Sequence, residues 1–357
     1  MRLRASLLTA DTAAPDSHAA ASHLVGLQAQ DARAGVLSFR PRTQGVTARD
    51  VSDSRAAARI VRTWLMRGTL HFAAAEDVRW LLRLLGPRAI RSTARRRAQL
   101  GLTEPVVARG LDTLRDLLAD GPLARRTLLS ALGDAGLPVE GQGGIHLLMR
   151  AALEGIVSFG PDVEGQETFV LLEDWLHDAP DDAPSDPLAA LARRYLLAYA
   201  PAAPEDFSAW SGQTLTGARK AFERLSSELI HVQVGSEGEW LPAEYESWHG
   251  ASAAGDVRLL PAYDTYLLGW RNRDAVLPAA FAKRIYPGGG TLHPAVLADG
   301  VVVARWRLRT VNGAATVEVM PFEPLGAAVE RGLAAEAADV GRFLGVGAGL
   351  TVTSPAG

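Results

Sequence analysis

The stretch "TWLMRGTLHFA", residues 63–73, decides the fold class of this chain. Its two halves, Thr63–Met66 and Thr69–Phe72, are rich in β-branched, aromatic and other apolar residues, which predicts two short strands. Arg67-Gly68 between them predicts the turn, since glycine adopts backbone angles that other residues disfavour. Helical sequence precedes this hairpin, and helices followed by a hairpin are the pattern of a winged-helix module.

The same pattern occurs three times along the chain, over residues 1–100, 101–178 and 185–250. The acid-rich "HDAPDDAPSDP", residues 177–187, predicts a linker between the second and third repeats. Residues 256–357 differ, because several strand-like segments are followed there by one long helical segment. We therefore predict a mainly α, α+β fold: three tandem winged-helix modules and a small β-rich C-terminal domain.

One segment of that last domain, "YDTYLLGWRNRD" (263–274), is predicted to be part of a strand. If the strand is buried, its Asp264 and Arg271 form a structural ion pair.

Composition excludes several classes of protein. The 357 residues contain no cysteine, which rules out disulfides and thiolate metal sites and fits a reducing cytoplasm. No apolar run approaches the roughly 18 residues that span a bilayer, and the N-terminal apolar stretch is too short for a signal peptide. The eight histidines lack metal-ligand spacing, and the glycine-rich stretches are not phosphate loops. We expect a cytoplasmic protein without a metal or a cofactor.

Charge is distributed unevenly along the chain, although the net charge is only −3. Residues 33–100 contain fifteen arginines and four acids, a balance of +11. Residues 101–200 contain seven arginines and sixteen acids, a balance of −9. Phosphate affinity depends on local charge, so the N-terminal side is predicted to face a polyanion. A GC-rich genome explains arginine in place of lysine, but it does not explain this segregation.

Four blocks resemble, in order, those of the winged-helix family that includes the AlkZ and YcaQ DNA glycosylases: "LVGLQAQDARAG" (24–35), "WLMRGTLHFAAAEDV" (64–78), "LLPAYDTYLLGWRNRD" (259–274) and "HPAVLADGVVVARWR" (293–307). The resemblance covers roughly residues 20 to 345. Gln28-Ala29-Gln30 matches the Gln-x-Gln motif of the AlkZ-like branch, whereas the YcaQ-like branch has aspartate third. The resemblance implies that the protein excises N-alkylated purines, including bulky adducts and interstrand crosslinks. It also implies that Gln28 and Gln30 are the catalytic residues.

Neutral amides suit this chemistry only for certain leaving groups. A purine alkylated at N7 or N3 is already cationic, so it leaves without the general acid that glycosidases usually need. A glutamine carbonyl can then orient a water, while the NH₂ holds a phosphate or sugar oxygen. Residues two apart in a helix point to nearly opposite faces, so both amides reach one bond only if the helix ends near Leu27–Gln28. A regular helix through Asp31 would mean that only one glutamine is catalytic. The alternative is that Gln28 and Gln30 are ordinary surface polar residues that end a helix.

The resemblance implies that the partner is duplex DNA carrying alkylated purines. We expect a monomer that associates with the nucleoid. We predict phosphate contacts from nearby cationic groups: Arg33, Arg40, Arg42, Arg67, His71, Arg95, Arg96, Arg97, Lys283 and Arg284. The glycine-rich loop around Gly288–Gly290 is predicted to enter a groove near the lesion. Taken singly, each of these residues could also be a solvated surface group.

Two other functions fit the same sequence. Winged helices are frequent in transcriptional regulators, although this chain offers no obvious dimerisation helix or ligand domain. A protein-interaction scaffold is the third alternative, with the acidic repeat as its contact surface.

Overall fold

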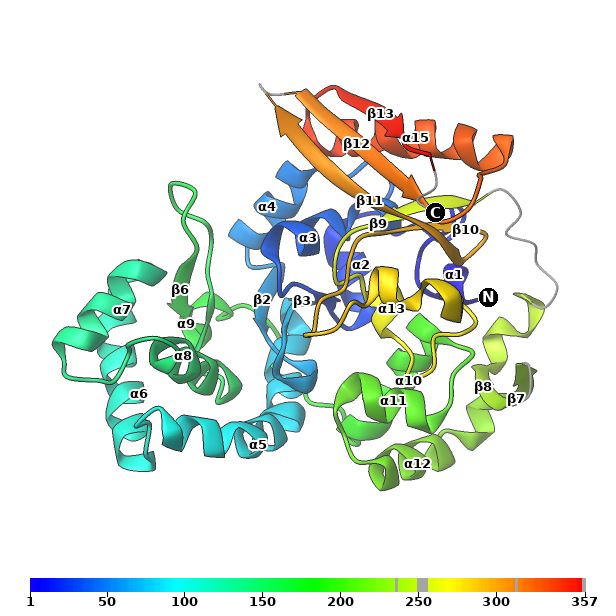
Figure 1. The fold of residues 1–357 in the computed structure, drawn as a ribbon. Coiled ribbons are helices and arrows are strands. Elements are labelled where there is room, and N and C mark those ends of the chain that lie inside the picture. Colours follow the sequence, from blue (N-terminus) through cyan, green and yellow to red (C-terminus); the bar gives the residue numbers. More distant parts are fainter. Residues whose placement is uncertain (235–236, 249–255, 312–313, 355–357) are drawn as a thin grey trace.

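The computed structural model describes residues 1–234, 237–248, 256–311 and 314–354 (Figure 1). A short helix α1 (Arg2–Ala5) precedes the first module. That module contains, in order, α2 (Ser17–Leu24), β1 (Leu27–Gln28), α3 (Ala32–Leu37), η1 (Arg40–Arg42), α4 (Ala48–Ala56), β2 (Ile60–Trp64), η2 (Met66–Gly68) and β3 (Leu70–Ala74). Strands β2 and β3 form the hairpin expected from residues 63–73, and β1 pairs with β3 on its far side.

The second module repeats this order. It contains α6 (Glu104–Leu118), β4 (Leu123–Ala124), α7 (Arg125–Asp134), α8 (Gly143–Leu153), β5 (Val157–Phe159), β6 (Thr168–Leu171) and α9 (Leu172–Trp175). Arg62 of β2 pairs with Phe159 of β5, so the two modules share one six-stranded sheet of order β1-β3-β2-β5-β6-β4. The 25-residue helix α5 (Ala75–Gln99) connects them (Figure 1).

The third module again places three helices before a hairpin. Its elements are α10 (Pro187–Tyr199), α11 (Pro204–Ser211), α12 (Leu215–Arg224), η3 (Ser226–Glu228), β7 (Leu229–Val234), β8 (Glu237–Pro242) and η4 (Ala243–Trp248). A bridge between Ala202 and Trp240 takes the place of the first strand. Helix α10 packs on α1 and α2, which fixes this module against the first.

The C-terminal domain is a five-stranded sheet of order β13-β12-β11-β10-β9, covered by one long helix that packs on β9 and β13. Its elements are β9 (Val257–Leu260), α13 (Thr265–Leu268), η5 (Ala279–Phe281), α14 (Ala282–Ile285), β10 (Ala295–Ala298), β11 (Val301–Val311), β12 (Ala314–Pro321), α15 (Ala327–Leu344) and β13 (Ala348–Val352). Mixed α+β architecture is thus confirmed. The predicted strand over 263–274 is wrong, since β9 ends at Leu260 and the short helix α13 follows.

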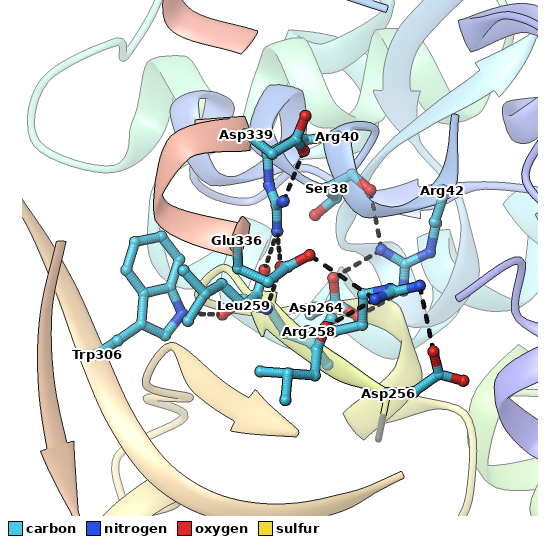
Figure 2. Close-up of polar contacts among 12 residues, drawn as sticks. Ser38, Arg40, Arg42, Asp256, Arg258, Leu259, Asp264, Trp306, Glu336 and Asp339 are labelled. Carbon is cyan, nitrogen blue, oxygen red and sulfur yellow. Dashed lines mark hydrogen bonds and ion pairs between the residues drawn. The ribbon is translucent and has the colours of Figure 1, made fainter. Parts of the chain in front are cut away.

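Buried ion pairs hold this domain on the first module (Figure 2). Arg42 and Asp264 pair in a bidentate arrangement, with N–O distances of 2.6 and 2.8 Å and both side chains fully buried. Arg40, also fully buried, donates to Glu336 at 2.6 Å and to Asp339 at 2.8 Å. The prediction that Arg40 and Arg42 contact DNA is therefore wrong. The ion pair predicted for Asp264 exists, but its partner is Arg42 instead of Arg271.

Candidate active site

The backbone leaves the helical conformation just before the glutamines. Helix α2 ends at Leu24, three residues earlier than predicted, and Val25 takes the left-handed conformation with φ of 58°. Gly26 follows with φ of +139°, and a Cβ atom there would lie 3.0 Å from the Met66 Cε and 3.4 Å from the His71 Cβ. The backbone angle strains any residue with a Cβ atom here, and the flexible Met66 side chain would also have to shift slightly. Gly26 thus lets the chain enter β1 against the first hairpin.

Gln28 lies in an extended strand, as catalysis by both amides requires. Its Cα partner across β3 is His71, and the next amide, that of Ala29, donates to the Leu70 carbonyl at 2.7 Å. Alternate residues of an extended segment share one face, whereas in a helix they would diverge. The expectation that Gln28 and Gln30 do not sit on a regular helix is confirmed.

Both glutamine side chains contact the same turn of the first hairpin. The Oε1 atom of Gln28, a buried residue, accepts a hydrogen bond from Arg67 Nη2 at 3.2 Å. Gln30 is exposed, and its Oε1 atom accepts from the Leu70 backbone N–H at 3.3 Å. Asp31, the next carboxylate in sequence, accepts from the Ala34 N–H and caps α3. Two amides, one buried and one exposed, are therefore presented together at residues 67–70.

A buried arginine holds the residue between the two glutamines. Arg62 donates from Nε and Nη2 to the Ala29 carbonyl at 3.0 and 2.9 Å. Its guanidinium also bonds Glu167 and lies 4.5 Å from the Phe159 ring centroid. Burial lowers the pKa of Arg62, and the Glu167 carboxylate partly offsets that effect. The second module thereby helps to fix the backbone of the motif.

His71 is neutral in this environment. It is 2% exposed, and burial together with the nearby Arg67 charge lowers its pKa to about 3. Its Nδ1 lies 2.9 Å from the Thr69 carbonyl, which fixes the proton on Nδ1. A buried neutral imidazole cannot pair with a phosphate, so the predicted DNA contact of His71 is wrong.

The other predicted DNA contacts divide by exposure. Arg97 is buried and donates to Ile90 and Thr93 of its own helix, so its prediction is also wrong. The following cationic residues are exposed: Arg33, Arg67, Arg95, Arg96 and Lys283. Arg284 is half-buried, with its guanidinium 5.3 Å from the Phe322 ring centroid.

Helix α5 presents two exposed arginines that were not predicted from the sequence, Arg88 and Arg91, together with the predicted Arg95. Arg88, Arg91 and Arg95 lie at spacings of three and four residues, which places them on one exposed helix face. Arg88 donates to the Gly212 carbonyl at 2.6 Å, and a Cβ atom at Gly212 would touch the Arg67 backbone at 3.4 Å. This arginine stripe, Arg88–Arg91–Arg95, therefore starts beside the turn that holds both glutamines. Helical spacing in residues 75–99 is the signal that could have identified it.

The glycine-rich loop forms a tight turn. Thr291 donates its N–H to the Gly288 carbonyl at 3.1 Å, and Gly289 and Gly290 have φ of 63° and 79°. Positive φ at both central residues is typical of a hairpin turn, which glycine allows without strain.

The described ranges contain neither a candidate metal site nor a candidate membrane span. No three His, Asp or Glu side chains gather there in a group that could hold a metal ion. The helices in these ranges include none that is both long and apolar enough to cross a membrane.

Comparisons with known proteins agree with this geometry. The model of the family described as "DNA glycosylase AlkZ-like" matches residues 21–343. An interstrand DNA cross-link repair glycosylase of Streptomyces sahachiroi is 28% identical over 353 residues, covering 93% of this chain and 92% of that protein. The solved structure of the DNA glycosylase AlkZ of the same organism has the same fold, with a TM-score of 0.80, 24% identity, and coverage of 99% of this chain and 97% of that one. The chain belongs to the AlkZ-like family of DNA glycosylases.

Proposed function

We propose that this DNA glycosylase hydrolyses the N-glycosidic bond of N7- and N3-alkylated purines in duplex DNA, with Gln28 and Gln30 as its catalytic residues. The observation that carries the proposal is the placement of both amides against one turn. They lie beside the exposed Arg67 and the arginine stripe. An extended backbone allows both side chains to approach one scissile bond.

The partners of the two amides support a positioning mechanism. Each Oε1 atom accepts one hydrogen bond, from Arg67 or from Leu70, and keeps a second lone pair that can orient a water beneath C1′. Neutral amides are weak bases, so the leaving group must depart without protonation. An alkylated purine, which is cationic, meets this condition, and an unmodified base does not.

DNA is held, in this proposal, by exposed cations around the site. Arg33, Arg95 and Arg96 keep their predicted role, and Arg88 and Arg91 join them. These arginines make sequence-independent phosphate contacts, each of which releases condensed counterions.

The β5–β6 hairpin of the second module contacts the first module through two ion pairs. Its Asp162 and Glu167 pair with Arg55 and Arg62, so neither carboxylate faces a phosphate.

The turn at Gly288–Gly290 and the adjacent Lys283 and Arg284 are proposed to enter a groove near the lesion. The two-residue turn at Gly289 and Gly290 is narrow and exposed, which suits insertion beside a distorted base pair. Deletion of the three glycines should lower excision of an alkylated purine. Unchanged excision and unchanged DNA affinity would remove the loop from the proposal.

Bulky adducts and interstrand crosslinks are proposed as substrates, on the basis of the relative named as a cross-link repair glycosylase. A crosslinked base cannot be flipped into a deep pocket, so an open surface such as the exposed Gln30 fits such a lesion. We propose that the chain acts on nucleoid DNA as a monomer.

The decisive experiment measures abasic sites in duplex DNA that contains one N7-methylguanine. Native protein should excise that base, while Gln28→Ala and Gln30→Ala should lose excision and retain DNA binding. Gln44→Ala is the matched control, because Gln44 is exposed and its side chain makes a long hydrogen bond, 3.4 Å, to the Ala13 carbonyl. Binding without excision of any alkylated purine would favour a regulator. Release of ordinary guanine or uracil at a comparable rate would refute the amide mechanism.

A further inference from the structure

We propose that Arg67 is a positioning residue, which orients the Gln28 amide so that its NH₂ group faces the bound substrate. This role rests on the proposed function of Gln28 and replaces the phosphate contact predicted for Arg67. Three independent features of the structure support it: the partners of Arg67, the orientation that they impose on Gln28, and the backbone conformation of the turn.

Arg67 is held at both ends of its guanidinium. One terminal nitrogen, Nη1, donates to the Trp210 carbonyl, and the other, Nη2, donates to Gln28 Oε1. Trp210 lies in the last turn of α11, where carbonyl groups lack helical partners and carry the negative end of the helix dipole. Arg67 therefore links the third module to Gln28 in the first.

The chemistry of the two side chains fixes the orientation of the amide. Arginine has only donors, and the amide has one acceptor atom, so Oε1 must be the atom that faces Arg67. The Gln28 NH₂ then points away from Arg67, and it has no hydrogen-bond partner in the described part of the chain. This amide can donate two hydrogen bonds to a sugar or phosphate oxygen of the substrate.

The backbone at Arg67 is strained. Its φ of 57° and ψ of 14° lie in the left-handed region, and Gly68 follows with φ of 69°. Glycine would adopt the first of these conformations without cost, whereas arginine does so at a disadvantage. Strain of this kind persists where a side chain serves a function, which here is the reach from the turn to Gln28.

The test separates positioning from phosphate binding. In Arg67→Ala, the single-turnover excision rate at saturating enzyme should fall about 10²-fold, the loss typical of a misplaced catalytic group. Affinity for undamaged duplex and its salt dependence should stay unchanged. A phosphate contact would instead lower the slope of log K against log salt by about 0.9. Arg115→Ala is the matched control, because Arg115 is an exposed arginine of α6 in the second module, outside the proposed DNA-binding surface, and its loss should change neither the slope nor the saturated rate.

Two further variants address the mechanism. Arg67→Ala should have no further effect in a Gln28→Ala background, because its whole effect passes through Gln28. Gln28→Glu should lose excision to the level of Gln28→Ala, since a carboxylate accepts from Arg67 but cannot donate. Because Arg67 is exposed, added methylguanidinium should restore part of the Arg67→Ala rate.

Folding is checked with Arg67→Gly, which relieves the backbone strain. It should melt within a few degrees of the native protein and still excise as slowly as Arg67→Ala. Normal excision by Arg67→Ala, or a reduced salt slope with a normal saturated rate, overturns the positioning role alone. Absence of excision by the native protein overturns the proposed function, and the positioning role with it.

Discussion

Substitution of Arg42 by alanine should severely destabilise the protein and leave its contacts with DNA unchanged. Arg42 and Asp264 have no exposed side-chain surface, and two hydrogen bonds of 2.6 and 2.8 Å join them. Arg42 also donates to the Ser38 carbonyl at 2.9 Å (Figure 2). Without Arg42, the hydrogen bond that remains to the buried Asp264 carboxylate within the described ranges is that from the Tyr266 backbone N–H, 2.9 Å away.

The expected loss follows from the burial of that remaining charge. Breaking a buried ion pair by removing one partner typically costs about 3–5 kcal/mol, because the other charge stays uncompensated. Total stabilities are roughly 5–15 kcal/mol, so Arg42→Ala approaches the limit of folding. The matched control is Arg49→Ala, whose partner Asp53 lies 3.8 Å away and whose side chain is 90% exposed. Exposed helix pairs contribute about 0.3–0.5 kcal/mol.

Urea unfolding with a constant m value measures both losses. Arg42→Met/Asp264→Asn should cost less than Arg42→Ala, since neither charge is then buried alone. The salt dependence of duplex binding should be unchanged in every variant that folds. A loss below about 1 kcal/mol for Arg42→Ala, or a salt slope lowered by about 0.9, would refute the assignment of Arg42 to the domain interface.

Three further predictions concern the surroundings of the glutamines. The pKa of His71, about 3 in the folded protein against 6.5 unfolded, means that the unfolded state binds more protons between these values. Stability should fall as pH drops below 6.5, by up to about 1.4 kcal/mol per unit, and His71→Asn should flatten that dependence in urea titrations. Substituting Arg88, Arg91 and Arg95 together by glutamine should lower the salt slope of duplex binding by about 2.7, measured by fluorescence anisotropy. The control substitutes three arginines that are exposed elsewhere by glutamine, which gives the same change in charge and should leave the slope unaltered: Arg83, Arg109 and Arg115. Gly26→Ala should reduce both thermal stability and excision, because alanine is strained at φ of +139° and Met66 must also shift to make room for the Cβ atom. Normal thermal stability and normal excision in this variant would contradict the prediction.

Local patterns allowed the hairpins and the glutamine geometry to be predicted. The hairpin over residues 63–73 follows from its alternation and turn residues, which act over a few positions. The end of α2 followed from a stereochemical requirement, the approach of Gln28 and Gln30 to one bond. Residues 263–274 were misjudged because an apolar run without tertiary context fits a strand and a short buried helix equally.

Long-range ion pairs could not be predicted, because charge in a sequence does not identify its partner. Asp264 lies 222 residues from Arg42, and Glu336 lies 296 residues from Arg40. Part of the segregation of charge also has a structural cause. Four arginines of the basic segment pair with acids of the acidic one: Arg55 with Asp162, Arg62 with Glu167, Arg83 with Asp181 and Arg97 with Glu104. The basic surface left for DNA is therefore smaller than the balance of +11 suggests.

The neutrality of the site leads to a final prediction about substrate range. Gln28 and Gln30 can orient a water and a sugar, but neither amide can protonate a departing base. The acceleration should then be similar for every cationic lesion, so excision rates should parallel the uncatalysed depurination rates of the same lesions. A series with N7-methylguanine, N3-methyladenine and neutral hypoxanthine, assayed in single turnovers, measures this relation. Hypoxanthine should lie far below both methylated purines. If it is accelerated as strongly as they are, a proton donor acts on the base, and the amide pair alone does not account for catalysis.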